Sequence, residues 1–219
     1  GTQMKTFFTA AIALTASSQA LAADIRVIDG DTIELNRITY RLHGIDAPEV
    51  GQSCKTARGT NWACGKAAVE VMEDLVLGAS VACEAREDDG YGRTLAVCYA
   101  DGTDINAEMV RQGYAWAFRR YAMDYAALED QTRAARLGVW AAQSQAPWDY
   151  RAQKWNVAEQ QAPDGCPIKG NISSNGRIYH APWSPWYSRT KITVAKGERW
   201  FCNEADAVQA GWRPPYWGR

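Results

Sequence analysis

Four short features in the first two thirds of the chain combine residue types that suit phosphate chemistry. Residues 29–32 (DGDT) place two carboxylates in a tight turn, where both can face one cation. Residues 46–49 (DAPE) place two more acids around a proline, where they can hold a metal ion and a water molecule. Residues 91–93 (YGR) and the isolated Arg41 supply guanidinium groups. Together they could carry out cation-assisted attack of water on a phosphodiester.

Each of these features has an ordinary explanation when taken alone: a hairpin turn, a solvated loop or a surface arginine. Their combination in one order is more informative. A hard dication takes oxygen ligands, which aspartates and a backbone carbonyl provide, and a neighbouring carboxylate can orient or deprotonate water. Two arginines have forked donors that match the oxygens of a pentacoordinate phosphate. The set therefore indicates phosphodiester cleavage.

The elements that must position these residues begin with a β-meander over residues 24–49. Apolar and polar residues alternate as in half-buried strands, with a turn at residues 29–31, and Pro48 ends the run. Arg41 and Asp46 are five residues apart, so strict alternation would send them to opposite faces of a strand. We expect Gly44 to bend the chain between them. The neighbouring His43 is expected to be packed or solvent-facing rather than catalytic.

The rest of this region predicts helices at residues 64–77, 104–113 and 122–137, and a hairpin whose strands include 81–83 and 95–99. Five short strands with helices packed on one end favour an α+β protein. We expect an OB-fold five-stranded β-barrel with three helices, plus a small C-terminal α+β module.

The chain divides into four predicted segments: a signal peptide at 1–22, the OB-fold domain at 23–141, a linker at 142–164 and a small basic, aromatic-rich module at 165–219. The first segment has a positive start and an apolar stretch shorter than the roughly 20 residues that span a bilayer, followed by small residues. The alternative is a retained membrane anchor. Cleavage would leave no membrane span and a secreted or periplasmic protein.

The motifs together resemble the staphylococcal nuclease (thermonuclease) family. The resemblance runs from residue 24 to about 141, through the segments VIDGDTI, YRL, IDAPE, DGYGR, NAEMVRQG and LGVW. It implies a calcium-dependent enzyme that hydrolyses its DNA and RNA substrates, with no stable protein partner and a monomeric state.

The resemblance also implies a role for each candidate residue. Asp31, Asp46 and the carbonyl of Ala47 would bind Ca²⁺, with Asp29 as an acid behind them. Glu49 would act on the attacking water as general base or positioner. The catalytic arginines would be Arg41 and Arg93, which bind the phosphate and its transition state, while Tyr91 and Tyr121 would contact the substrate.

Three positions depart from the family pattern. Ala47 stands where a threonine is familiar, which is tolerable if only the carbonyl binds the ion. Gly90 replaces a basic residue and Arg119 replaces a tyrosine. These changes affect expected nucleotide affinity more than chemistry.

The six cysteines predict three disulfides among 15 formal pairings, because export leads to an oxidising compartment. If the hairpin turn centres between Gly90 and Tyr91, Cys83 lies directly opposite Cys98, at a separation that suits a disulfide. Cys54 would then pair with Cys64, and Cys166 with Cys202. The alternatives are buried thiols at 83 and 98, and a zinc site of Cys166, Cys202 and His180.

Charge is divided unevenly along the chain. Residues 23–150 have 13 basic and 20 acidic side chains, a net charge of −7, whereas residues 151–219 have 10 and 5, a net charge of +5. Because affinity for nucleic acid rests largely on Lys and Arg contacts to phosphate, we expect residues 165–219 to help hold the substrate. The other functions considered are a binding-only OB-fold and an envelope protein whose module binds glycan; a module docked on the acidic domain is the alternative to substrate binding.

Overall fold

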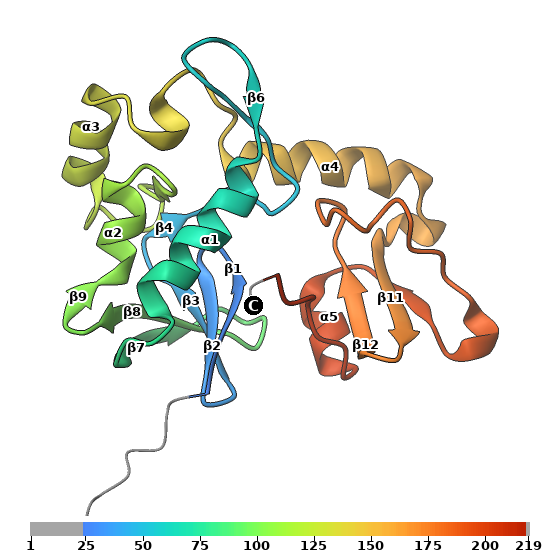
Figure 1. The fold of residues 1–219 in the computed structure, drawn as a ribbon. Coiled ribbons are helices and arrows are strands. Elements are labelled where there is room, and N and C mark those ends of the chain that lie inside the picture. The colour runs from blue at the N-terminus through green and yellow to red at the C-terminus, as the bar shows by residue number, and fades with distance from the viewer. Residues whose placement is uncertain (1–23, 218–219) are drawn as a thin grey trace, which may run out of the picture.

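The computed structural model describes residues 24–217, so the signal peptide expected at 1–22 lies outside the described residues. Two lobes make up this part of the chain, and the long helix α4 (Pro147–Gln161) runs along both (Figure 1). Across residues 24–217, no helix combines the length and the apolar character that crossing a membrane requires.

The first lobe is built on a sheet of six strands in the order β1-β2-β3-β8-β7, with β9 paired to β8. Strands β1 to β3 form the expected antiparallel meander, and β3 pairs in parallel with β8. The bounds are β1 (Ile25–Asp29), β2 (Thr32–Leu35), β3 (Ile38–Leu42), β7 (Val81–Asp88), β8 (Thr94–Ala100) and β9 (Thr103–Asp104). The mixed α+β class is confirmed, whereas a closed barrel of five strands stays a prediction.

Three helices form in this lobe where the sequence predicted them: α1 (Cys64–Val76) and α2 (Ile105–Arg111), which pack on the sheet, and α3 (Ala126–Ala134), which packs on α2. Helix α1 packs against β1 because Ala68, Met72 and Val76 recur on one face and are fully buried. Asp104 caps α2, since its carboxylate accepts a hydrogen bond from the backbone N–H of Ala107. The lobe is completed by β4 (Ile45–Asp46), β5 (Cys54–Lys55), β6 (Asn61–Trp62), β10 (Trp116–Ala117) and the short helix η1 (Gly138–Trp140).

The second lobe is the expected C-terminal module, a three-stranded sheet in the order β12-β11-β13 with one helix. Its core is formed by Ile168, Tyr179, Phe201, Ala207 and Trp212. The bounds are η2 (Pro163–Gly165), β11 (Ile168–Ser173), β12 (Gly176–His180), η3 (Val194–Lys196), β13 (Arg199–Phe201) and α5 (Glu204–Gln209).

The segment predicted to be a linker is mostly the 15-residue helix α4. Trp148 on this helix stacks on Phe118 of the first lobe at 5.3 Å between ring centroids, and Trp155 lies 6.3 Å from Trp183 of the module. The helix therefore contacts both lobes. The boundaries of the predicted segments stay predictions, but residues 147–161 are an ordered, packed element.

All three predicted disulfides are present: Cys54–Cys64, Cys83–Cys98 and Cys166–Cys202. Cys83 and Cys98 are directly paired between β7 and β8, as the hairpin register predicted. The disulfide at Cys166 excludes the alternative zinc site, and His180 instead lies with Nδ1 3.2 Å from the Ser184 hydroxyl.

Candidate active site

The first part of the site is a corner formed by the ends of β2, β3 and β4. Arg41 lies between two aspartates: its Nη1 is 2.8 Å from Asp31 Oδ1, and its Nη2 is 2.8 Å from Asp46 Oδ1. The chain turns between β3 and β4 at Gly44, whose φ of +75° is one that L side chains rarely adopt. The expected bend at Gly44 is confirmed, and it brings Arg41 and Asp46 to the same side.

Asp31 is held at this corner by its own neighbours. Its Oδ2 accepts a hydrogen bond from the backbone N–H of Ala47 at 2.8 Å, and its Oδ1 accepts one from the Thr32 hydroxyl at 3.1 Å. The preceding residue must be glycine, because a Cβ at Gly30 would lie 2.8 Å from the Cβ of Ala68 on α1. Burial raises the pKa of Asp31, against the lowering effect of the Arg41 guanidinium.

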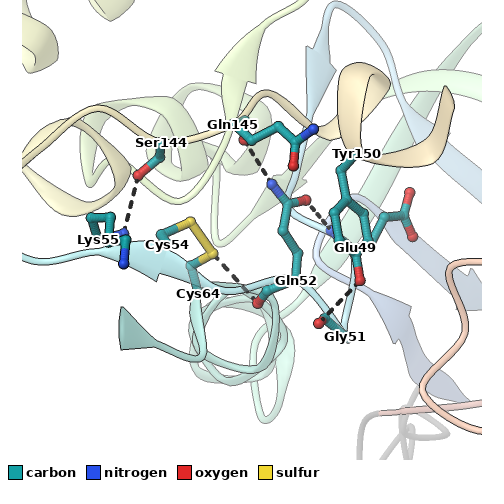
Figure 2. Close-up of a disulfide and its surroundings, with 9 residues drawn as sticks. All are labelled: Glu49, Gly51, Gln52, Cys54, Lys55, Cys64, Ser144, Gln145 and Tyr150. Carbon is teal, nitrogen blue, oxygen red and sulfur yellow. Dashed lines mark hydrogen bonds between the residues drawn. A yellow bond between two sulfur atoms is a disulfide. The ribbon is translucent and has the colours of Figure 1, made fainter. Parts of the chain in front are cut away.

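Glu49 follows on the loop after β4, and its backbone is fixed from two sides. The side-chain carbonyl of Gln52 accepts a hydrogen bond from the Glu49 N–H at 3.2 Å, and the Gln52 amide donates to the Gln145 carbonyl at 2.7 Å (Figure 2). Helix α1 passes so close that a Cβ at Gly65 would lie 1.8 Å from the Glu49 carbonyl oxygen. The Cys54–Cys64 disulfide lies beside this loop (Figure 2) and ties it to the start of α1.

An arginine that the sequence analysis did not single out completes the corner. Arg151 on α4 places Nη1 3.0 Å from Asp46 Oδ1 and 2.8 Å from Glu49 Oε1, and Nη2 2.8 Å from Asp46 Oδ2. The Asp46 side chain is fully buried, and that of Glu49 is 14% exposed. Asp46 is therefore enclosed by two guanidinium groups, Arg41 on one side and Arg151 on the other.

The electrostatics of the corner follow from burying several charges together. Burial raises the pKa of Glu49 to about 8; Arg151 lowers it, and the charges of Asp29 and Asp31 raise it further. The pKa values of Arg41 and Arg151 are raised in spite of burial, because the surrounding carboxylates favour their charged forms. Both arginines are therefore permanent cations.

The second part of the site is the tip of the β7–β8 hairpin. Asp89 organises it: one carboxylate oxygen accepts hydrogen bonds from the backbone N–H groups of Tyr91 and Arg93, and the other lies 2.5 Å from Arg93 Nε. The Arg93 guanidinium also lies over the Tyr91 ring, 5.7 Å from its centroid. Tyr91 is 44% exposed and the Arg93 side chain is 25% exposed, so this arginine is held by Asp89 but remains partly open to solvent.

Corner and hairpin tip line one cavity of about 650 Å³. Six residues that the sequence singled out contribute to its wall: Asp29, Arg41, Glu49, Tyr91, Arg93 and Tyr121. The other three, Asp31, Asp46 and Ala47, do not line the cavity but are buried next to Arg41 and Glu49. The module also lines this cavity, through residues that include Tyr179, Trp183, Trp212 and Arg213.

The donors at the corner fit a hard dication by their chemistry, since Asp31, Asp46 and the Ala47 carbonyl would offer only oxygen. Their carboxylates are ion-paired with Arg41 and Arg151. Within residues 24–217, no three Asp, Glu, His or Cys side chains gather as a metal cluster. A cation at Asp46 would therefore have to share this carboxylate with guanidinium groups.

The departures from the family pattern have structural counterparts. The Arg119 guanidinium is 2.8 Å from the Glu129 carboxylate through Nε and also pairs with Asp130, so it is directed into its own lobe. Gly90 has a φ of +75° at the hairpin tip. Tyr121 is 71% exposed at the cavity edge and packs on Phe118 at 5.0 Å between ring centroids.

A signal for Arg151 was present in the sequence. Pro147 marks a helix start, and Trp148, Arg151, Trp155 and Ala158 follow at helical spacing. The Gln- and Ala-rich composition favoured a linker instead. That this helix face meets the acidic corner follows only from the packing of the two lobes.

Comparisons with known proteins match both parts of the described chain. A family model described as "Staphylococcal nuclease homologue" matches residues 39–142, and a second model, described as "ArfC", matches residues 149–214. A "Micrococcal nuclease" of Shigella flexneri is 38% identical over 151 residues, covering 61% of this chain and 81% of that protein. An "Uncharacterized endonuclease" of Escherichia coli O157:H7 is 36% identical over 138 residues, covering 59% of this chain and 84% of that protein.

Proposed function

The chain belongs to the staphylococcal nuclease family and is a phosphodiester-hydrolysing nuclease; from this premise we propose that it is a calcium-dependent enzyme that cleaves both DNA and RNA. One observation carries the proposal. The acidic corner with Arg41 and Glu49, and the hairpin tip with Arg93, open into the same cavity. A phosphodiester in that cavity meets carboxylates on one side and a guanidinium on the other.

In this proposal Glu49 acts on the attacking water, as general base or by orienting it, because its carboxylate lines the cavity and its backbone is fixed by Gln52. Arg41 and Arg93 bind the phosphate oxygens and stabilise the additional negative charge of the transition state. Arg41 is already oriented by its two aspartates, so it needs little reorganisation during the reaction. Tyr91 and Tyr121 line the entrance and contact the nucleotide.

Asp31, Asp46 and the carbonyl of Ala47 would hold Ca²⁺, with Asp29 behind them. When bound, the ion would polarise a phosphate oxygen and lower the pKa of a coordinated water. Asp29 supports this arrangement, since its Oδ1 accepts a hydrogen bond from the Asp31 N–H at 3.1 Å. The all-oxygen donor set favours Ca²⁺ over soft metal ions.

The protein is proposed to act as a monomer after export, in the periplasm or outside the cell. Three disulfides support an oxidising compartment. The five-stranded OB barrel with three helices is proposed as the catalytic scaffold.

We also propose that residues 165–219 hold the substrate. The supporting observation is that Trp183 and Arg213 of the module line the same cavity as Arg41 and Arg93. Basic residues of the module are partly engaged internally: Lys169 donates to the carbonyls of Tyr187 and Thr190, and Arg213 donates to those of Pro214 and Asn175 while lining the cavity. We therefore propose that the module contacts the substrate through its residues in the cavity wall, and not through its whole basic surface.

A plasmid-nicking assay tests the nuclease proposal. Glu49→Gln keeps the size of the side chain but removes the carboxylate, and loss of a general base lowers rates about 100- to 10,000-fold. The matched control is Glu70→Gln, on an exposed position of α1, which should nick at the wild-type rate. A wild-type protein that binds DNA without nicking it would favour the binding-only alternative.

A truncation after Gln160 tests the substrate-binding proposal for the module. On long DNA across a salt series, we expect a raised KM, a shallower salt dependence and little change in kcat. The same KM and salt slope as the full chain would show that the module does not hold substrate.

A further inference from the structure

Arg151 contacts a carboxylate that we propose as a ligand of the metal ion. It contacts both oxygens of Asp46, the proposed ligand that is fully buried, and one oxygen of Glu49. It comes from α4, outside the matched nuclease segment 39–142 and within the matched segment 149–214. The carboxylates of the matched nuclease segment are therefore paired with a guanidinium group from the other matched segment.

The hydrogen bonds leave little of Asp46 free. A carboxylate offers about four lone-pair positions. Oδ1 accepts from Arg41 Nη2 and Arg151 Nη1, and Oδ2 accepts from Arg151 Nη2, so three positions are used. A dication bound to Asp46 would lie close to a guanidinium of the same sign, in a buried environment where charges are weakly screened.

Arg151 is held in place by contacts that do not depend on the acids. One residue before it, the Tyr150 hydroxyl donates to the Gly51 carbonyl at 3.2 Å (Figure 2). Trp148 stacks on Phe118, and Trp155 packs toward the module core. The helix thus presents the guanidinium at a fixed position, where it neutralises the corner when no metal is bound.

We propose that Arg151 is a built-in counter-ion that competes with the divalent cation for Asp46 while pairing with Glu49, and so sets the cation concentration at which the nuclease becomes active. This inference rests on the proposed function, because it takes the corner as the cation site. Two cations that bind the same carboxylate weaken each other's binding reciprocally. Arg151 therefore lowers cation affinity and stabilises the metal-free protein.

The first test is titration of the full chain with Ca²⁺ in a calorimeter. Removing one positive charge next to a dication in a poorly screened site should tighten binding, so we expect Arg151→Gln to lower Kd by about tenfold or more. Arg151→Lys keeps the charge without the fork, and should bind Ca²⁺ with a Kd between those of wild type and Arg151→Gln. The control Lys154→Gln removes the same charge from an exposed position on the same helix and should leave Kd within about twofold, because exposed charges are screened.

The second test uses stability and does not depend on activity. In EGTA, Arg151→Gln should melt below Lys154→Gln, since Asp46 and Glu49 lose a buried partner. In saturating Ca²⁺ the gap should narrow, because the ion replaces the missing charge. A purely structural role for Arg151 predicts the same gap in both conditions.

An Arg151→Gln variant that binds Ca²⁺ no tighter than wild type, with an unchanged gap in Tm, overturns the inference. If the wild type then still nicks plasmid in Ca²⁺, the proposed function stands without it. Tighter binding by Arg151→Gln, in a protein that never cleaves nucleic acid, would instead support the counter-ion and contradict the nuclease assignment.

Discussion

The two arginines of the nuclease domain that line the cavity, Arg41 and Arg93, are held in opposite ways. Arg41 is 17% exposed and lies between two buried aspartates, at a corner fixed by a glycine turn and by α1. Arg93 is 25% exposed at a hairpin tip and pairs only with Asp89 among its carboxylate neighbours in the described chain. At the corner, the same ion pairs stabilise the fold and orient the groups that we propose for catalysis, so a change to one charge affects both. The tip can lose its guanidinium at little cost to the fold.

The largest effect should come from breaking the corner at Asp46. Asp46→Ala removes the carboxylate that both Arg41 and Arg151 contact, so two buried cations lose a partner. Breaking a buried pair typically costs about 3–5 kcal/mol, and the proposed cation loses a ligand as well. We expect cleavage at least about 1,000-fold slower, by analogy with lost metal and charge stabilisation.

Urea unfolding and plasmid nicking measure these two losses. The control is Asp74→Ala on an exposed position of α1, which should change neither. An Asp46→Ala protein as stable as wild type would show that the corner is not the coupled unit described above.

At the tip, Arg93→Ala should affect activity alone. Loss of one transition-state donor lowers the rate at least about 100-fold, or roughly 2.7 kcal/mol. Arg86→Ala, on an exposed position of β7 in the same hairpin, is the matched control. Steady-state nicking kinetics, measured under conditions where wild type and variants are fully folded, check the effect. Near-normal turnover would place Arg93 outside the site, and a large loss of stability would remove the contrast between tip and corner.

The Cys83–Cys98 disulfide, between the two strands of the hairpin, sharpens the comparison further. The bridge closes a loop with a sequence separation of 15 residues, for which the chain-entropy model gives a stabilisation of about 3 kcal/mol. The double variant Cys83→Ser/Cys98→Ser should lose stability of this order, while Asp31, Arg41 and Asp46 keep their contacts. Unfolding experiments and kcat measured well below Tm check this. A kcat that falls as far as that of Arg93→Ala would mean that the tip depends on the bridge for its geometry.

The last comparison concerns the pH dependence of the metal-free corner. Burial raises the pKa of Glu49 to about 8 in the folded protein, above its ordinary value of 4.5. The folded state therefore keeps a proton that the unfolded chain releases, so stability falls as pH rises from 4.5 toward 8. Urea unfolding in EGTA across this range should show a steeper fall for wild type than for Glu49→Gln. Parallel curves would mean that Glu49 titrates normally.

The sequence predicted most of the fold, because the determining signals are local. The alternation in residues 24–42, the apolar face of residues 64–76 and the hairpin register all depend on neighbours along the chain. The register was specific enough to place Cys83 opposite Cys98, and Gly44 was correctly expected to bend the chain between Arg41 and Asp46.

The sequence did not predict what depends on packing between distant segments. Arg151 reaches Asp46 across 105 positions of the chain, and nothing local to residues 147–161 indicates an acidic partner. The module residues that line the cavity, and the internal hydrogen bonds of Lys169, likewise depend on packing between distant segments. Composition indicated a basic surface, but only the packed structure shows which side chains remain available to a substrate.

The most direct test of the central claim is cleavage by the wild-type chain under controlled calcium. Plasmid and RNA should both be cut in millimolar Ca²⁺, cleavage should stop in excess EGTA, and it should return when Ca²⁺ is restored, because the proposed ligands are all oxygen donors. Cleavage that persists in excess EGTA would contradict the calcium-dependent nuclease proposed here.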